Sequence, residues 1–303
     1  MHQSTDDRSR IDIEGLERPV RVFHVTDPHL CSIDQRDTPE RYEKWKDSRE
    51  RSGQQFATLL GKPADQPMYP DVTFARTMAL ASDPAIDLIA ITGDLMMFPA
   101  LASIDAAAAA IARAGRPTLY TSGNHDWFFP RAGSGPTLRQ QWMHVLEPFH
   151  RGRPDGDSLD IAGLRFLTID NSTYAVTAEQ LAFARRQLAD GLPTIVLMHI
   201  PLSLPTLRQP VIDKWKDPIM LADLDWPVER RGKWCAQPNT PETLAFADLL
   251  RTAPNLVAIL CGHVHFAHAD RINDHAVQYV GGPGYEGQWR QIELRPAHSQ
   301  DST

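Results

Sequence analysis

Five short apolar runs in this chain each lead into a residue type that binds metals. The segments that follow them are Asp27-Pro28-His29, Gly93-Asp94, Gly123-Asn124-His125-Asp126, His199 and Gly262-His263-Val264-His265. Continuous apolar runs of this kind are typical of strands that are covered on both faces. Parallel strands bring their carboxyl ends to one edge of a sheet, which is where open α/β sheets bind ligands. The series therefore predicts an α/β fold whose strand ends converge on one site.

Helical patterns alternate with the predicted strands. A capping box, in which Thr177 is the N-cap and Gln180 the third helical residue, predicts one helix start, and Gly115 predicts a helix end. Ala162-Gly163 predicts the turn of a hairpin. We expect strands at 21–26, 87–92, 117–121, 158–161, 164–170, 194–198, 256–261, 276–280 and 289–294, and helices at 71–82, 100–114, 138–146, 178–189 and 241–251. This alternation, with hairpins added, indicates an α/β fold with mixed sheets.

The distribution of polar residues and prolines predicts the domain organisation. Residues 1–17 are polar and charged, so we expect a flexible segment there, and we expect a second one at 297–303. Residues 18–296 are predicted to be a single domain with insertions near 32–70 and 201–241. The second insertion contains Trp215, Trp226 and Trp234, which are interpreted either as packing of a surface loop or as a rim that faces the substrate.

Charge and hydropathy exclude several classes of protein. The formal net charge of the 303 residues is −7, and no strongly basic block is present, which argues against a nucleic-acid-binding surface. A small phosphorylated substrate is compatible with this charge, because a bound metal supplies local positive charge. The chain has no apolar stretch of the roughly 18–20 residues that span a membrane. The start of the chain lacks the pattern of a signal peptide, so we expect a cytoplasmic protein.

The donor atoms at the strand ends predict which metals bind. Two carboxylates, four imidazoles and one amide oxygen form a mixed set that favours manganese, iron or zinc, with nickel and cobalt as further candidates. Seven ligands are too many for one tetrahedral zinc but suit two metals that share one carboxylate. Two such metals can activate a hydroxide and bind the oxygens of an in-line displacement at phosphorus. The seven candidate ligands are Asp27, His29, Asp94, Asn124, His199, His263 and His265.

These motifs, in this order, resemble the five motifs of the calcineurin-like metallophosphoesterases. The resemblance implies a four-layer α/β/β/α sandwich with two mixed β-sheets. It implies that one metal is held by Asp27, His29 and His265, that the other is held by Asn124, His199 and His263, and that Asp94 bridges both.

The resemblance also assigns roles around the metals. His125 matches the position that faces the substrate phosphate and acts as an acid or electrostatic stabiliser, and Asn124 would lie at the same phosphate. Asp126 is predicted to be catalytic by orienting His125 or a ligand, although a local turn role is an equally good interpretation. Many relatives have a polar or acidic residue soon after Gly93-Asp94, whereas this chain continues with Leu95-Met96-Met97-Phe98.

The sequence thus predicts a metal-dependent hydrolase of phosphate esters. A small phosphodiester or phosphomonoester is the favoured substrate. A non-catalytic binding or scaffold protein on the same fold is one alternative, although no motif residue is missing here. A nuclease is another alternative, which the acidic charge balance disfavours.

Overall fold

Two six-stranded β-sheets form the centre of the protein. The computed structural model describes residues 2–5, 7–63, 65–128, 136–234 and 236–297. The first sheet has the strand order β1 (His2–Ser4), β2 (Arg8–Ile13), β12 (Arg290–Pro296), β3 (Val20–Val25), β4 (Leu88–Thr92) and β5 (Thr118–Thr121). The second sheet has the order β10 (His268–Arg271), β11 (Val277–Val280), β9 (Leu256–Cys261), β8 (Thr194–Leu197), β7 (Leu164–Ile169) and β6 (Gly156–Ile161). Both sheets contain parallel and antiparallel pairs, as the sequence predicts.

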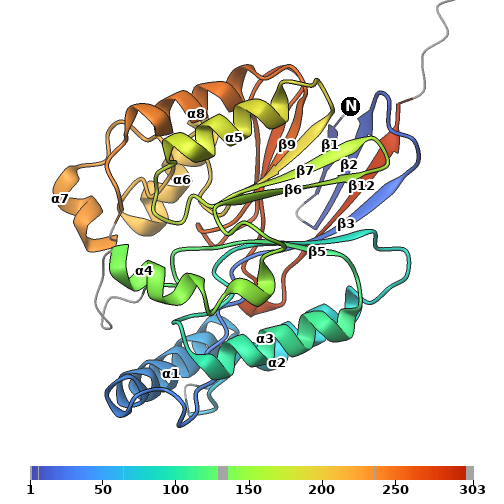
Figure 1. Cartoon of the computed structure of the whole chain (residues 1–303). Coiled ribbons are helices and arrows are strands. Elements are labelled where there is room, and N and C mark those ends of the chain that lie inside the picture. The colour runs from blue at the N-terminus through green and yellow to red at the C-terminus, as the bar shows by residue number, and fades with distance from the viewer. Residues whose placement is uncertain (1, 6, 64, 129–135, 235, 298–303) are drawn as a thin grey trace, which may run out of the picture.

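Helices cover the outer face of each sheet. The described helices are α1 (Pro39–Leu59), α2 (Pro70–Leu80), α3 (Leu101–Ala114), α4 (Pro136–Met143), α5 (Ala178–Leu188), α6 (Pro205–Trp215), α7 (Val228–Arg231) and α8 (Pro241–Thr252), with short 3₁₀ turns at Glu147–Phe149, Gly232–Trp234 and Gly284–Glu286. Figure 1 shows α5 and α8 on the second sheet and α2 and α3 on the first. The predicted four-layer α/β/β/α sandwich is therefore confirmed.

Three apolar cores separate these layers. The core between the two sheets includes Val22 and Leu88 from the first sheet and Ile195 and Leu260 from the second. A second core joins α2 and α3 to the first sheet, and a third joins α5 and α8 to the second sheet. All five residues of β4 are buried, because this strand faces a core on each side. The long apolar runs of the sequence thus follow from two packed sheet faces.

Three local predictions about helix ends and turns are confirmed. Thr177 and Gln180 form both hydrogen bonds of a capping box at the start of α5. Gly115 ends α3 with a φ of 64°, in the left-handed region that glycine adopts without a steric penalty. Ala162 and Gly163 have φ of 51° and 79° in the hairpin between β6 and β7.

The predicted flexible segment at residues 1–17 is wrong, because β1 and β2 occupy most of it. Ile11 and Ile13 alternate with polar residues along β2 and are buried in the core between the sheets. The strand pairs in parallel with β12, whose Arg290 donates from Nη1 to the Thr5 carbonyl (2.8 Å) and to Ser9 Oγ (2.9 Å). The alternation of polar and apolar residues along β2 is short and lies among charged residues, so the sequence did not predict this strand.

The two predicted insertions are more regular than the sequence suggested. Residues 32–70 contain the 21-residue α1, and residues 201–241 contain α6 and α7. The strand β10 lies in a stretch where none was predicted. Of the predicted tail at 297–303, only Ala297 belongs to the described residues, and its N–H donates to the Ile13 carbonyl (2.8 Å).

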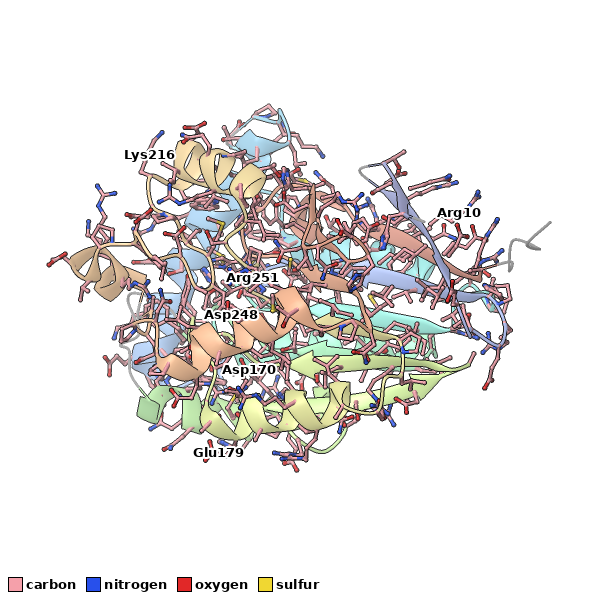
Figure 2. All side chains as sticks on the ribbon, turned by 90° about the horizontal axis from the view of Figure 1, so that it is seen from above. Arg10, Asp170, Glu179, Lys216, Asp248 and Arg251 are labelled. Carbon is pink, nitrogen blue, oxygen red and sulfur yellow. The ribbon has the colours of Figure 1, made fainter. Side chains whose placement is uncertain are left out.

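The surface over the second sheet carries charges of both signs. Figure 2 looks down on this side and shows Glu179 on α5 and Asp248 and Arg251 on α8. Asp248 and Arg251 form an ion pair at 3.0 Å. Across the described part of the chain, none of the helices is both long enough and apolar enough to cross a membrane.

Candidate metal centre

The seven candidate ligands lie at the carboxyl ends of five parallel strands. Asp27 and His29 follow β3, Asp94 follows β4 and Asn124 follows β5, all in the first sheet. The remaining three are in the second sheet, where His199 follows β8, and His263 and His265 follow β9. The site therefore lies where the edges of two sheets meet, whereas the sequence pattern alone suggested the edge of one.

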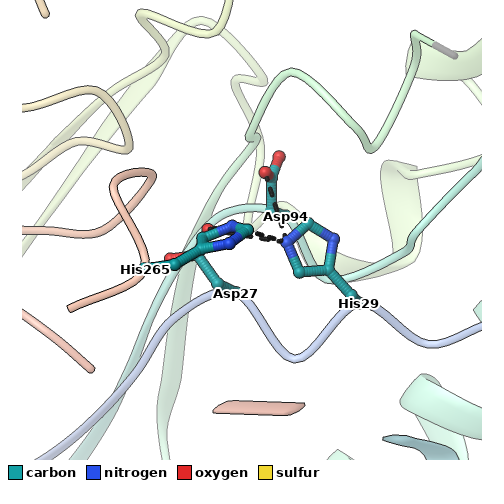
Figure 3. A group of neighbouring side chains, drawn as sticks. All are labelled: Asp27, His29, Asp94 and His265. Carbon is teal, nitrogen blue, oxygen red and sulfur yellow. Dashed lines mark hydrogen bonds and ion pairs between the residues drawn. The ribbon is translucent and has the colours of Figure 1, made fainter. Parts of the chain in front are cut away.

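The first group of side chains contains Asp27, His29, Asp94 and His265. One ligand atom from each of the four lies within 4.8 Å of all the others. His29 Nε2 is 3.0 Å from His265 Nε2, and His265 Nε2 is 3.2 Å from Asp27 Oδ1. Figure 3 shows the four side chains converging, with Asp27 and His29 on one backbone segment and Asp94 and His265 on two others. Two imidazoles and two carboxylates around one point form a site for a divalent cation.

The second group contains Asp94, His199 and His263, again with ligand atoms within 4.8 Å of one another. His199 Nε2 is 3.3 Å from Asp94 Oδ2 and 3.2 Å from His263 Nδ1. Asp94 thus belongs to both groups, as a carboxylate that bridges two metals must.

Asn124, which follows the strand β5, is the predicted further ligand of the second group. It is buried, and among the described residues its Oδ1 has no hydrogen-bond partner. The same holds for Oδ1 of Asp27 in the first group. A buried oxygen without a donor is costly, unless a cation takes the donor's place. The two groups, which together contain six of the seven side chains, and these two oxygens fit a pair of metal ions, and the role of each ligand stays a prediction.

Backbone strain is concentrated at the same residues. Nine described residues other than glycine have a positive φ, and five of them are candidate ligands, with φ between 50° and 72°: Asp27, His29, Asp94, His263 and His265. Each such residue costs roughly 1–3 kcal/mol, and this strain persists where surrounding contacts hold it in place. Here the strained turns aim ligand atoms from successive strand ends into one small volume.

Two glycines of the motifs allow the turns to approach each other. A Cβ on Gly123 would collide with the backbone N and the carboxylate of Asp94. A Cβ on Gly262 would collide with the side chains of Thr26 and Asp27. The glycines therefore keep the strand ends close enough to share metals.

Hydrogen bonds from neighbouring groups fix the ligand atoms. Asp27 Oδ2 accepts from Thr26 Oγ1 (2.7 Å) and from the His263 N–H (2.9 Å), so Oδ1 is left for a cation. His199 donates from Nδ1 to the Thr92 carbonyl (2.7 Å), so Nε2 is left. Such outer contacts orient metal ligands and set their tautomers.

Tyr174 is a member of this outer layer that the sequence did not reveal. It is buried, and its hydroxyl lies 3.1 Å from His263 Nε2, whereas His263 Nδ1 faces the metal group. The tyrosine lies in the loop after β7, beside Asn171, whose Oδ1 accepts from the His199 N–H (3.1 Å). The available signal was a further polar strand end at Asp170-Asn171, at the close of the predicted hairpin.

Two of the histidines are in the protonation state that binds metals, and a third is not. Burial lowers the pKa of His29 and His263 to about 3, so both imidazoles are neutral at neutral pH, the form that binds metals. Burial also opposes a charge on His199, but the Asp94 carboxylate outweighs it and raises the pKa of His199 to about 9. Metal binding near neutral pH is therefore expected to release a proton from His199.

His125 lies beside the first group with one ring nitrogen already engaged. Its backbone N–H donates to Asp94 Oδ1 (2.8 Å), and its ring lies edge-on to that of His29, with centroids 4.9 Å apart. Nδ1 lies 2.8 Å from the Met97 carbonyl. The ring is therefore next to the metal groups, and contact with a substrate phosphate stays a prediction.

Asp126 accepts hydrogen bonds from three neighbouring groups, and its predicted catalytic role stays a prediction. Its Oδ1 accepts from the Met96 N–H (2.9 Å), and its Oδ2 accepts from the Gly123 N–H (2.8 Å) and from the Tyr120 hydroxyl (2.7 Å). Burial raises its pKa to about 7. These contacts tie together the turns that carry Asp94 and Asn124.

The tryptophans of the second insertion lie in different surroundings. Trp226 is buried in the core under the second sheet, where it packs against Tyr174. Trp215, at the end of α6, donates from Nε1 to the Val264 carbonyl (3.0 Å), and its ring lies 5.2 Å from that of His265. The Trp234 side chain lies outside the described part of the structure. One tryptophan therefore packs, and another borders the metal centre.

Comparison with known proteins places this geometry in a family. The model of the calcineurin-like phosphoesterases matches residues 20–267, and the chain belongs to this family of dinuclear metal enzymes. It is thus a metallophosphoesterase, a hydrolase of phosphate esters, as the order of the motifs predicts. No curated protein sequence matches this chain significantly.

Two solved structures share the fold. A dimetal phosphatase from Danio rerio is 11% identical with a TM-score of 0.52, over 91% of this chain and 93% of that one. A purple acid phosphatase from yellow lupin (Lupinus luteus) seeds is 16% identical with a TM-score of 0.55, over 91% of this chain but only 46% of that one. At such identities the likeness shows the common architecture.

Proposed function

We propose that this protein hydrolyses a small phosphodiester or phosphomonoester at a dinuclear metal centre. The observation that carries the proposal is that two groups of ligand atoms share the Asp94 carboxylate. Asp27, His29 and His265 would hold one ion, and Asn124, His199 and His263 the other. Bound metal ions supply Lewis acidity toward phosphate oxygens and lower the pKa of water.

The protein's own residues position the substrate around those ions. Asp94 and Asp27 are fully buried carboxylates, so their charge is available to cations but not to water. His125 directs Nε2 away from the Met97 carbonyl and can contact a phosphate oxygen or the leaving oxygen through that atom. Lys214 donates from Nζ to the His265 carbonyl (2.6 Å), so its ammonium adds positive charge at the border of the site.

Burial of the site supports a small substrate. Six of the seven candidate ligands are buried, and only His265 is partly exposed. Trp215 lies beside His265, the partly exposed ligand, with ring centroids 5.2 Å apart, and so borders the site where a substrate would approach. A phosphate at the end or in the middle of a small molecule reaches buried ligands more easily than one in duplex nucleic acid or a folded protein.

Activity measurements on two ligand variants test the proposal. The substrate is bis-p-nitrophenyl phosphate with Mn²⁺, and metal content is measured on the same samples. Asp94→Asn removes the shared charge and His263→Ala removes one ligand of the second group, so each should abolish hydrolysis. Asp248→Asn, on the surface of α8, is the matched control and should keep it. Full activity in either ligand variant would refute the scheme.

A substrate panel separates the remaining alternatives. We expect turnover of at least one of the cyclic nucleotides, phosphomonoesters and phospholipid head groups, and loss of that turnover with a chelator. Chelator-sensitive cleavage of DNA would instead indicate a nuclease. Full metal loading without hydrolysis of any phosphoester would indicate a scaffold or binding role.

A further inference from the structure

The apolar segment Leu95–Phe98 packs against helix α1 through Phe98. The Phe98 ring is fully buried and stacks on the Trp45 ring of α1, with centroids 4.9 Å apart and an interplanar angle of 11°. Cys31 and Ala100 complete this small core. Removing such an indole from a buried stack leaves a cavity, into which the segment can shift.

The residue before Phe98 holds His125. The Met97 carbonyl lies 2.8 Å from His125 Nδ1. A carbonyl oxygen can only accept, so Nδ1 carries the proton in the neutral ring and this contact sets the direction of the imidazole. The Met97 N–H donates to the Leu30 carbonyl (2.8 Å), which joins this segment to the chain that follows His29.

Helix α1 contacts the wall of the metal centre at further points. Arg49 donates from Nη1 to the Cys31 carbonyl (2.7 Å) and so holds the chain next to Leu30. The Phe56 ring lies 4.8 Å from that of Tyr285, which in turn lies 5.4 Å from the His265 ring. Helix α1 therefore contacts Phe98, the neighbour of Met97, and also Tyr285, the aromatic neighbour of His265.

We propose that α1 positions His125, and that Trp45 and Phe98 are positioning residues for the phosphoesterase reaction. The Trp45–Phe98 stack fixes the Met97 carbonyl, and that carbonyl fixes the tautomer and the direction of the imidazole. In this chain the apolar contact between Trp45 and Phe98 thus orients the His125 imidazole. The effect on catalysis rests on the proposed function, whereas the effect on the histidine tautomer does not.

The experiment compares Trp45→Leu, which removes the stack, with Trp45→Phe, which keeps an aromatic ring. Trp289→Leu is the control, because Trp289 also stacks on a buried phenylalanine, Phe23, at 4.3 Å. Nitrogen NMR of the zinc-loaded protein reports the His125 tautomer, with the resonance assigned through His125→Asn. Steady-state kinetics and metal content are measured on the same variants.

We expect Trp45→Leu to lower kcat by about tenfold or more, because a misplaced catalytic group costs on this scale. KM and metal content should stay unchanged, and the Nδ1-protonated signal of His125 should weaken. Trp45→Phe and Trp289→Leu should keep both kcat and the signal. If Trp45→Leu does not fold, Phe98→Leu provides the same test.

The proposal is overturned if Trp45→Leu or Phe98→Leu leaves the His125 signal as in the wild type. It is also overturned if kcat falls equally in Trp289→Leu. If the wild-type protein hydrolyses no phosphoester, the proposed function fails, and the NMR comparison still decides whether α1 orients His125.

Discussion

Replacing Tyr174 by phenylalanine should weaken metal binding at the second group without touching a metal ligand. The Tyr174 hydroxyl lies 3.1 Å from His263 Nε2 and is the acceptor that leaves Nδ1 free of its proton. The ring of Tyr174 also packs edge-on against Trp226 and His263, with centroids 5.2 and 5.3 Å away. Phenylalanine keeps this packing, so the substitution isolates the hydrogen bond.

The expected magnitude follows from what the lost hydroxyl leaves behind. A buried N–H without an acceptor costs about 1–3 kcal/mol. Loss of an outer hydrogen bond to a metal-binding histidine lowers metal affinity by about 10–100-fold, or about 1.4–2.7 kcal/mol. These two free-energy ranges overlap, so we expect the metal dissociation constant of Tyr174→Phe to rise by at least about tenfold.

Competition with a chelator measures this affinity for Mn²⁺ or Zn²⁺. Tyr279→Phe is a matched control, since Tyr279 is a buried tyrosine whose hydroxyl lies 3.0 Å from Nδ1 of His2, a residue outside the candidate metal ligands. It should leave metal affinity unchanged. An affinity of Tyr174→Phe within about twofold of the wild type would refute the reasoning that this hydroxyl orients His263.

Two further predictions concern pH and charge. Burial, reinforced by the charge of Arg290, lowers the pKa of His24 to about 3, so the unfolded chain binds a proton below pH 6.5 that the folded protein does not. The free energy of unfolding should therefore decrease as the pH is lowered from 6.5 to 5, and this histidine alone should account for about 1.6 kcal/mol of that decrease; urea unfolding at both values should show a smaller pH dependence in His24→Gln. Lys214→Gln removes an ammonium beside the metal centre and should raise KM for an anionic substrate by about two- to fivefold, with a weaker dependence on salt; an unchanged KM would show that Lys214 does not face the substrate.

The sequence alone was sufficient for the class of fold and for the residues that could bind metals. Strands covered on both faces must be apolar along their whole length, so β4 and β8 were visible as uninterrupted runs. Their polar endings were visible because metal binding requires donor atoms that a core cannot otherwise tolerate. Local signals such as the capping box at Thr177 and the glycine at 115 also needed no tertiary information.

Structural elements whose sequence pattern is short, or whose stability depends on distant segments, could not be predicted from the sequence. The strand β2 is held by its register with β12, almost 300 residues later, and its two buried isoleucines are a weak pattern among charges. Helix α1 appears polar in sequence because few of its residues are buried, yet one of them, Trp45, makes the stack on Phe98.

The same physical reason explains which features of the site the sequence showed and which only the tertiary structure decided. Residue types and their order follow from chemistry, and the sequence contains both. Which strand ends belong to which sheet, which carboxylate lies between two groups, and which hydroxyl or carbonyl fixes each histidine depend on distances between segments far apart along the chain. Tyr174 and Met97 have their roles only because folding brings them within 3.1 and 2.8 Å of His263 and His125. The sequence determined which atoms could hold a metal, and the packing of two sheets decided how those atoms are grouped and held.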